Sequence, residues 1–171
     1  MSGLAGGVER LTRGLSRAVE AALVVLTATF SGLAFVQVVL RYGLNHALFW
    51  ADELSLFAFT WTIFLSAALA LDRRGHFGVS ILVARLPPGM RQAIAVAVHL
   101  VMLAVVGFLL WFGTLHAWDN WVQVSDVLRL PLTWWYLALP VACLLMGLSL
   151  VRDLALLARG GALPGPADDF V

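Results

Sequence analysis

Four long apolar stretches constrain this 171-residue chain more than any other feature. They cover about residues 18–40, 49–71, 92–118 and 132–157, and their centres carry almost no charge. A membrane-spanning helix needs about 20 predominantly apolar residues, so each stretch is long enough to cross a bilayer. Because 61% of all residues are hydrophobic, a soluble core of this size could not bury them. We predict an all-α integral membrane protein with four transmembrane helices.

The stretches divide the chain into three parts. Residues 1–17 form an N-terminal segment, residues 18–157 form the transmembrane domain, and residues 158–171 form a tail rich in Gly and Pro that we expect to be disordered. The first stretch is too long for the apolar region of a signal peptide and lacks a small-residue cleavage site. We therefore expect it to be retained as a helix.

The arginines predict the orientation, because positively charged flanks stay in the cytoplasm. Nine of the eleven basic residues fall on one side of the predicted helices: Arg10, Arg13, Arg17, Arg73, Arg74, Arg85, Arg91, Arg152 and Arg159. Only Arg41 and Arg129 fall on the other side. This distribution predicts that both termini are cytoplasmic.

Two shorter segments have the pattern of helices that lie in the membrane interface. Apolar residues recur at helical spacing over about residues 4–15, with arginines largely on the other faces. Four glycines in the same region make a frayed tail an equal alternative. Residues 77–86 are apolar but too short to span, so we place them at the cytoplasmic interface.

The sequence offers no evident path for a solute. Transport pathways leave ionisable residues deep in helices or paired broken helices, and this chain shows neither pattern. Pro140 is the only proline deep in a stretch, and a kink explains it. Since we expect no polar seam between the helices, we infer that the chain does not carry substrate alone.

Cofactor and metal sites are not expected either. His46 and His76 fall in loops on opposite sides, while His99 and His116 share one helix but lie 17 residues apart, or roughly 25 Å. No pair suits one haem iron. Cys143, the single cysteine, is expected to pack as a small apolar residue. A net charge of only +1 argues against a nucleic-acid partner.

Two acids, Asp52 and Glu53, open the second predicted helix at the outer surface. Carboxylates at this position interact favourably with the positive end of the helix dipole, and this interaction alone would account for both acids. An ion pair with Arg41, or a contact with a partner protein, is the functional alternative. The sequence leaves these explanations open.

Small residues recur every four positions along the second helix, at Ala58, Thr62, Ser66 and Ala70. This spacing lets another helix approach closely in a membrane. The sequence does not say whether that helix belongs to this chain or to another subunit.

Several short motifs occur in a familiar order: Arg41-Tyr42, Trp50-Ala51-Asp52-Glu53, residues 61–68 (WTIFLSAA), residues 73–79 (RRGHFGV) and Leu86-Pro87-Pro88. In this order and spacing they resemble the small membrane subunit of tripartite ATP-independent periplasmic (TRAP) transporters. The resemblance covers about residues 18–157 and rests on the order of the motifs, since no single motif is diagnostic.

The resemblance implies a scaffold subunit of the bacterial inner membrane, not an enzyme. Such a subunit braces a large transport subunit, which takes up organic acids that a periplasmic binding protein delivers, driven by a sodium or proton gradient. Arg41, Asp52 and Glu53 would then face the periplasm, where the binding protein arrives. Residues 73–76, including Arg73, Arg74 and His76, would face the cytoplasm, where lipid headgroups or the large subunit could pair with them.

Two other classes of protein remain as alternatives. A membrane-anchor subunit of a respiratory enzyme would bind haem or quinone, and the histidine spacing argues against it. A small self-assembling transporter would need a polar residue at mid-membrane on a shared face, and the sequence offers no good candidate.

Overall fold

The computed structural model describes residues 2–73 and 88–158, and these residues are largely helical. The helices are α1 (Ser2–Gly43), α2 (Phe49–Asp72), α4 (Pro88–Asp119), α5 (Thr133–Tyr136) and α6 (Ala138–Ala158). Four stretches are long and apolar enough to cross a membrane: Gly14–Gly43, Phe49–Asp72, Gln92–Asp119 and Thr133–Ala158. The predicted all-α architecture with four membrane-spanning helices is confirmed.

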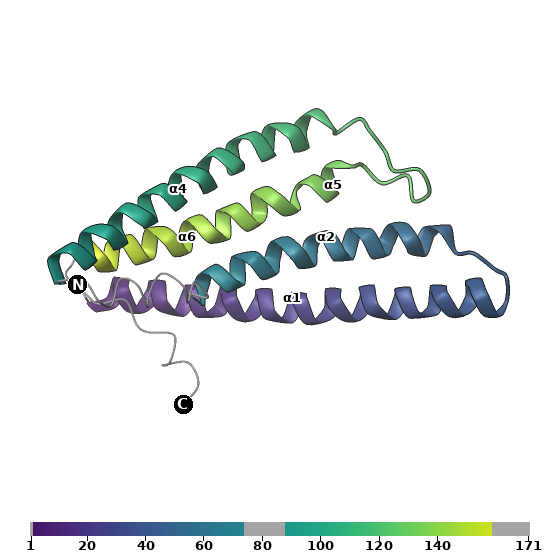
Figure 1. Ribbon diagram of the computed structural model, residues 1–171, viewed down its shortest axis with the longest axis horizontal. Helices are drawn as coiled ribbons and strands as arrows, with labels where there is room; N and C mark the ends of the chain where they lie inside the picture. Colours follow the sequence, from purple (N-terminus) through teal and green to yellow (C-terminus); the bar gives the residue numbers. More distant parts are fainter. Residues whose placement is uncertain (1, 74–87, 159–171) are drawn as a thin grey trace.

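The helices form a row, in the order α1, α2, α6 and α4 (Figure 1). Helix α1 packs along α2, α2 packs against α6, and α6 packs along α4, while α1 and α4 make no comparable contact with each other. The described part of the chain is therefore an open row of helices and not a closed bundle.

Along the helix axes the row has two ends, and these differ in residue composition. Helix α1 starts, α2 ends, α4 starts and α6 ends at the same end (Figure 1). We call it the arginine-rich end, since Arg17, Arg73 and Arg152 lie in these segments. The opposite end holds the α1–α2 turn and the loop between α4 and α5, and we call it the tryptophan-rich end.

Burial within the chain is confined to narrow contact lines. Small residues dominate where α2 meets its neighbours, with Ala51, Ala58 and Ala68 at most 3% exposed. A compact apolar cluster of Val106 and Cys143, with Leu150, joins α4 to α6. The outward surfaces carry large exposed apolar side chains, as expected for a protein that meets lipid or another membrane subunit.

Helix α1 extends well beyond the first predicted span. Its 42 residues would measure roughly 63 Å at 1.5 Å per residue, about twice the thickness of a hydrocarbon core. Residues 4–15 are helical, but they continue the spanning helix without a break and do not form a separate interfacial helix (Figure 1). The second predicted interfacial segment, residues 77–86, lies outside the described residues.

The last span is interrupted near its start, between α5 and α6. Pro140 has no backbone N–H, so the carbonyl of Tyr136 loses its usual partner four residues on. The backbone of Leu137 nevertheless stays helical, with φ −63° and ψ −20°, and its N–H donates to Thr133 O at 2.8 Å. Pro140 thus removes one hydrogen bond from a span that runs from Thr133 to Ala158, and the kink expected at this proline stays a prediction.

Candidate functional site: polar clusters at both ends of the helix row

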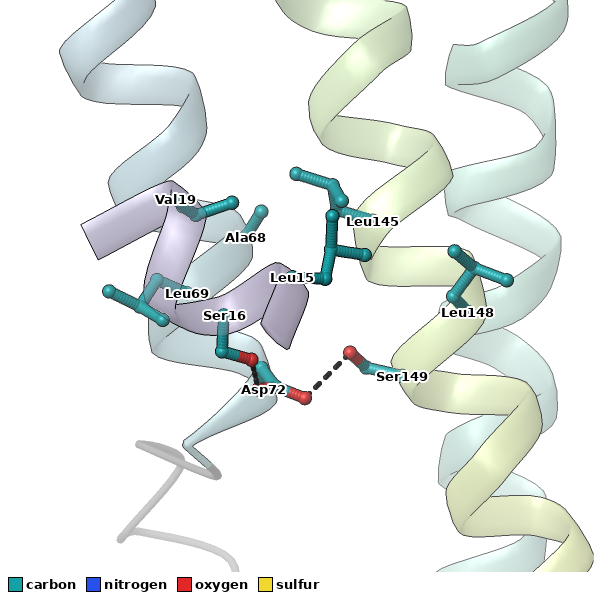
Figure 2. A pocket seen from close by; sticks show the side chains of 9 residues that line it. All are labelled: Leu15, Ser16, Val19, Ala68, Leu69, Asp72, Leu145, Leu148 and Ser149. Carbon is teal, nitrogen blue, oxygen red and sulfur yellow. Dashed lines mark hydrogen bonds between the residues drawn. The ribbon is translucent and has the colours of Figure 1, made fainter. Parts of the chain in front are cut away.

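The carboxylate of Asp72, the last residue of α2, joins three helices at the arginine-rich end. Ser16 of α1 donates its hydroxyl to Oδ2 at 2.8 Å (Figure 2). Ser149 of α6 donates to Oδ1 at 2.8 Å, and Arg152 approaches the same oxygen at 3.1 Å through Nη1. Both oxygens of the carboxylate are therefore occupied by contacts with α1 and α6.

The network continues from α6 to α4. The Nε of Arg152 donates to Asp153 Oδ1 at 3.2 Å, and the other oxygen of Asp153 lies 4.0 Å from Nε2 of His99. Since a carbonyl can only accept, His99 Nδ1 donates to Ala95 O at 2.8 Å. The residues Ser16, Asp72, Ser149, Arg152, Asp153 and His99 form what we call the inner polar cluster, which links α1, α2, α6 and α4.

This cluster refines the sequence analysis, which expected no ionisable residue deep in the helices and no polar seam between them. Asp153 is only 5% exposed and faces His99. Both residues lie within about three turns of a helix end, where a charge does not interrupt the apolar stretch, so the sequence did not mark them as a pair. Only the packing of α4 against α6 brings them together.

A small cavity of about 30 Å³ opens beside Asp72, between α1, α2 and α6 (Figure 2). Its walls are mostly apolar, including Leu15, Val19 and Leu145, and its polar side consists of Asp72 and two serines. One or two water molecules fit in such a volume. A site for a small organic molecule is typically about 300–1,000 Å³, so this cavity is far too small for one.

Within residues 2–73 and 88–158, no three His, Cys, Asp or Glu side chains come close enough together to hold a metal ion. His116 packs edge-on against the ring of Tyr136, with the ring centres 4.5 Å apart. His99 belongs to the inner polar cluster, well separated from His116 along α4. The geometry of these residues suits packing and helix–helix ties.

At the tryptophan-rich end, Arg41 and Asp52 form an ion pair, with Nη2 and Oδ2 3.2 Å apart. Asp52 lies in the first turn of α2, as the helix-dipole explanation requires. Both side chains are 46% exposed, so water screens the pair and its contribution to stability is small. The pair joins the end of α1 to the start of α2.

Glu53 has a different role from its neighbour Asp52. Its Oε2 accepts hydrogen bonds from the backbone N–H groups of Val127 and Leu128, both at 3.0 Å. These amides belong to the loop between α4 and α5, more than 70 residues away in sequence. The sequence gives no local signal for this contact, which fixes the loop against the start of α2.

The predicted small-residue stripe of α2 does not stay on one packed face. Ala58 is 2% exposed, Thr62 is half-buried and donates its hydroxyl to Ala58 O at 2.7 Å, and Ser66 and Ala70 are exposed. The half of the stripe nearer the arginine-rich end is therefore open to lipid or to another subunit.

The resemblance would place Arg73, Arg74 and His76 in the cytoplasm, and the structure describes one of these three residues. Arg73 is exposed, caps the end of α2 and pairs with Glu20 of α1. Arg74 and His76 lie outside the described residues. The pair with Glu20 adds a second link between α1 and α2 beside the inner polar cluster.

A family model and several known proteins match this chain, and all of them are described as components of TRAP transporters. The family model described as the DctQ component of tripartite ATP-independent periplasmic transporters matches residues 30–160. A Haemophilus influenzae protein named as a TRAP transporter small permease is 31% identical over 147 residues, which cover 82% of this chain and 87% of that protein.

Two relatives from Vibrio cholerae carry more specific names. The C4-dicarboxylate TRAP transporter small permease protein DctQ is 31% identical over 112 residues, which cover 60% of this chain and 48% of that protein. The sialic acid TRAP transporter small permease protein SiaQ is 24% identical over 127 residues, which cover 74% and 73% of the two chains.

Proposed function

The chain belongs to the DctQ family of TRAP transporter components, and from this we propose that it is a small permease subunit that braces a large transport subunit. In this proposal the chain performs no chemistry and is not an enzyme. The assembled transporter takes up an organic acid, delivered by a periplasmic binding protein, at the expense of an ion gradient.

The open row of helices is the observation that carries the bracing role. A chain that enclosed its own pathway would close its helices around that pathway. Here α1 and α4 are instead the two outer helices of the row and do not pack against each other. Most residues of these two spans are exposed within the single chain. A row of this kind offers long apolar faces to a partner subunit.

The polar residues also support a role in which this chain does not itself carry the substrate. In the described part of the chain, the side chains of the inner polar cluster bond to one another and tie helices together. The adjoining cavity of about 30 Å³ leaves no room for an organic acid. We therefore assign substrate passage to the large subunit.

The substrate class follows from the relatives by analogy. Two of them are named for a C4-dicarboxylate and for sialic acid, and both of these are carboxylates. We propose a carboxylate substrate for the transporter that contains this chain. Its place is the bacterial inner membrane, with the arginine-rich end in the cytoplasm. Reporter fusions at each chain terminus test the orientation: a signal from the periplasmic reporter at either end would contradict it.

Reconstitution tests the proposed function directly. The chain, the large subunit and the binding protein are purified separately, and uptake of a radiolabelled carboxylate is measured in proteoliposomes under a sodium or proton gradient. We expect uptake only when all three are present, and co-purification of the large subunit with a tagged form of this chain. Uptake by this chain alone, or undiminished uptake in its absence, would refute the bracing role.

A further inference from the structure

The loop between α4 and α5 exposes an unusual amount of apolar surface. Residues 120–132 form a short hairpin, with one isolated bridge between Val124 and Pro131. Its exposed apolar side chains are Val122, Val124, Val127 and Leu130, and Val122 is 88% exposed. Gln123, Asp126 and Arg129 are exposed as well, so the hairpin presents apolar and polar side chains together, as a segment in a membrane interface does.

Several backbone N–H groups of this hairpin donate hydrogen bonds within the protein. Ser125 N donates to Leu130 O at 2.8 Å, Leu132 N donates to Gln123 O at 2.9 Å, and Leu130 N donates to the hydroxyl of Ser125 at 3.1 Å. The two amides at the tip donate to Glu53. These bonds lower the cost of placing the hairpin against lipid, where water cannot pair with the backbone.

The contact with Glu53 also fixes the depth of the hairpin. Glu53 is the fifth residue of α2 and of the membrane span that begins at Phe49. Since Val127 N lies 3.0 Å from its carboxylate, the tip of the hairpin is level with the first turns of α2. The tip thus lies beside the end of a span and does not project away from it.

Exposed tryptophans surround the hairpin and continue its apolar surface. Trp118 at the end of α4 is 77% exposed, Trp121 at the start of the hairpin is 57% exposed, and Trp134 follows the hairpin in α5. Tryptophan rings favour the level of the lipid headgroups. Exposed Trp118 and Trp121 thus connect, along the chain, the exposed apolar side chains of α4 with those of the hairpin.

We propose that the 120–132 hairpin lies in the membrane interface at the tryptophan-rich end, with its exposed valines and Leu130 in contact with phospholipid. The hairpin then acts as an anchor that sets the height of α4 and α5 in the bilayer. Glu53 positions this anchor through the two amides at its tip. A partner protein on this surface and exposure to bulk water are the competing states that an experiment must separate.

Spin labels on the full chain in nanodiscs of phosphatidylcholine and phosphatidylglycerol test the proposal. The labelled variants are Val122→Cys and Val124→Cys, with His46→Cys as the water-exposed reference and Val105→Cys as the lipid-exposed reference. Cys143 is 2% exposed, so the unmodified chain should remain unlabelled and serve as the background. Collision rates with oxygen and with a water-soluble nickel chelate are measured for each label.

We expect both hairpin labels to favour oxygen over nickel more strongly than the label at His46, and less strongly than the label at Val105. Nickel access equal to that at His46 would overturn the proposal in favour of an aqueous loop. Loss of both oxygen and nickel access when the large subunit is present would overturn it in favour of a protein contact.

A second measurement uses the unmodified chain and does not depend on folding of the cysteine variants. Phospholipid with a diazirine near the glycerol end of its acyl chain is photolysed in the same nanodiscs, and the modified peptides are identified by mass spectrometry. We expect label on residues 120–132 as well as on the spans. Label confined to the spans would refute the lipid contact.

Discussion

Replacement of Asp72 by alanine should destabilise the protein more than any comparable change at the other end of the row. The substitution removes the acceptor of hydrogen bonds from Ser16 and Ser149 and the partner of Arg152. Hydrogen bonds to charged groups contribute about 1.5–3 kcal/mol each. Because the side chains of Asp72 and Arg152 remain 20% and 25% exposed, and Arg152 keeps its bond to Asp153, we expect a smaller total of about 3 kcal/mol.

Asp52→Ala is the matched control, because it removes the same side chain from the opposite end of the same helix. Asp52 pairs with Arg41 at 3.2 Å, but both side chains are 46% exposed. Exposed ion pairs of this kind contribute about 0–1 kcal/mol. Asp72→Asn should fall between the two, since its amide oxygen can still accept from Arg152.

The assay is unfolding of the purified chain in mixed micelles with rising SDS content, followed by circular dichroism. Free energies of unfolding are compared at a common SDS fraction. We expect the order wild type, Asp52→Ala, Asp72→Asn and Asp72→Ala, from most to least stable. If Asp72→Ala were no less stable than Asp52→Ala, the inner polar cluster would not hold the helices together and the reasoning would fail.

Three further contacts are tested by substitution, two of them with a matched control. Gly113→Leu should lower the free energy of unfolding by about 1–3 kcal/mol, because a Cβ there would stand 3.0 Å from a side chain of α6. Gly107→Leu is the control: a Cβ there meets open space, so the free energy of unfolding should change by less than about 0.5 kcal/mol. Equal losses for the two variants would contradict the packing of α4 against α6. Glu53→Gln should speed hydrogen exchange of the two hairpin amides that its carboxylate binds, and unchanged exchange would show that the contact does not order the hairpin. Ser66 is exposed, so Ser66→Leu should leave the stability of the chain unchanged but reduce capture of the large subunit. Ala58 is buried, so Ala58→Leu should destabilise the chain itself. Normal capture of the large subunit by the Ser66→Leu variant would show that this face meets lipid.

The sequence predicts the spans well because one physical requirement determines them. About 20 apolar residues are needed to cross the hydrocarbon core, and the predicted stretches fall within the four observed spans, apart from one residue at the start of the last. The same apolar pattern says nothing about which helices touch, because lipid and protein surfaces are equally apolar in a membrane. The open row therefore could not be predicted.

The polar contacts too could be predicted only in part from the sequence. The ion pair of Arg41 with Asp52 was among the sequence alternatives, since the two residues flank one short turn. The contacts of Glu53 with the hairpin, and of Asp153 with His99, connect residues far apart in sequence. Each of these side chains lies near the end of a span, where a charge is ordinary, so nothing in the pattern marks it.

The two ends of the row explain how a chain with so little buried surface keeps its shape. In a membrane, apolar burial does not drive helices together, so close packing of small residues and interhelical hydrogen bonds must do so. Along the row the contacts are made by residues such as Ala58, Ala68 and Cys143. At its ends, Asp72 and Glu53 each bind groups on another helix or loop. Because these contacts lie at the two ends of α2, they leave the long apolar flanks of α1 and α4 exposed within the single chain, as the proposed bracing role requires.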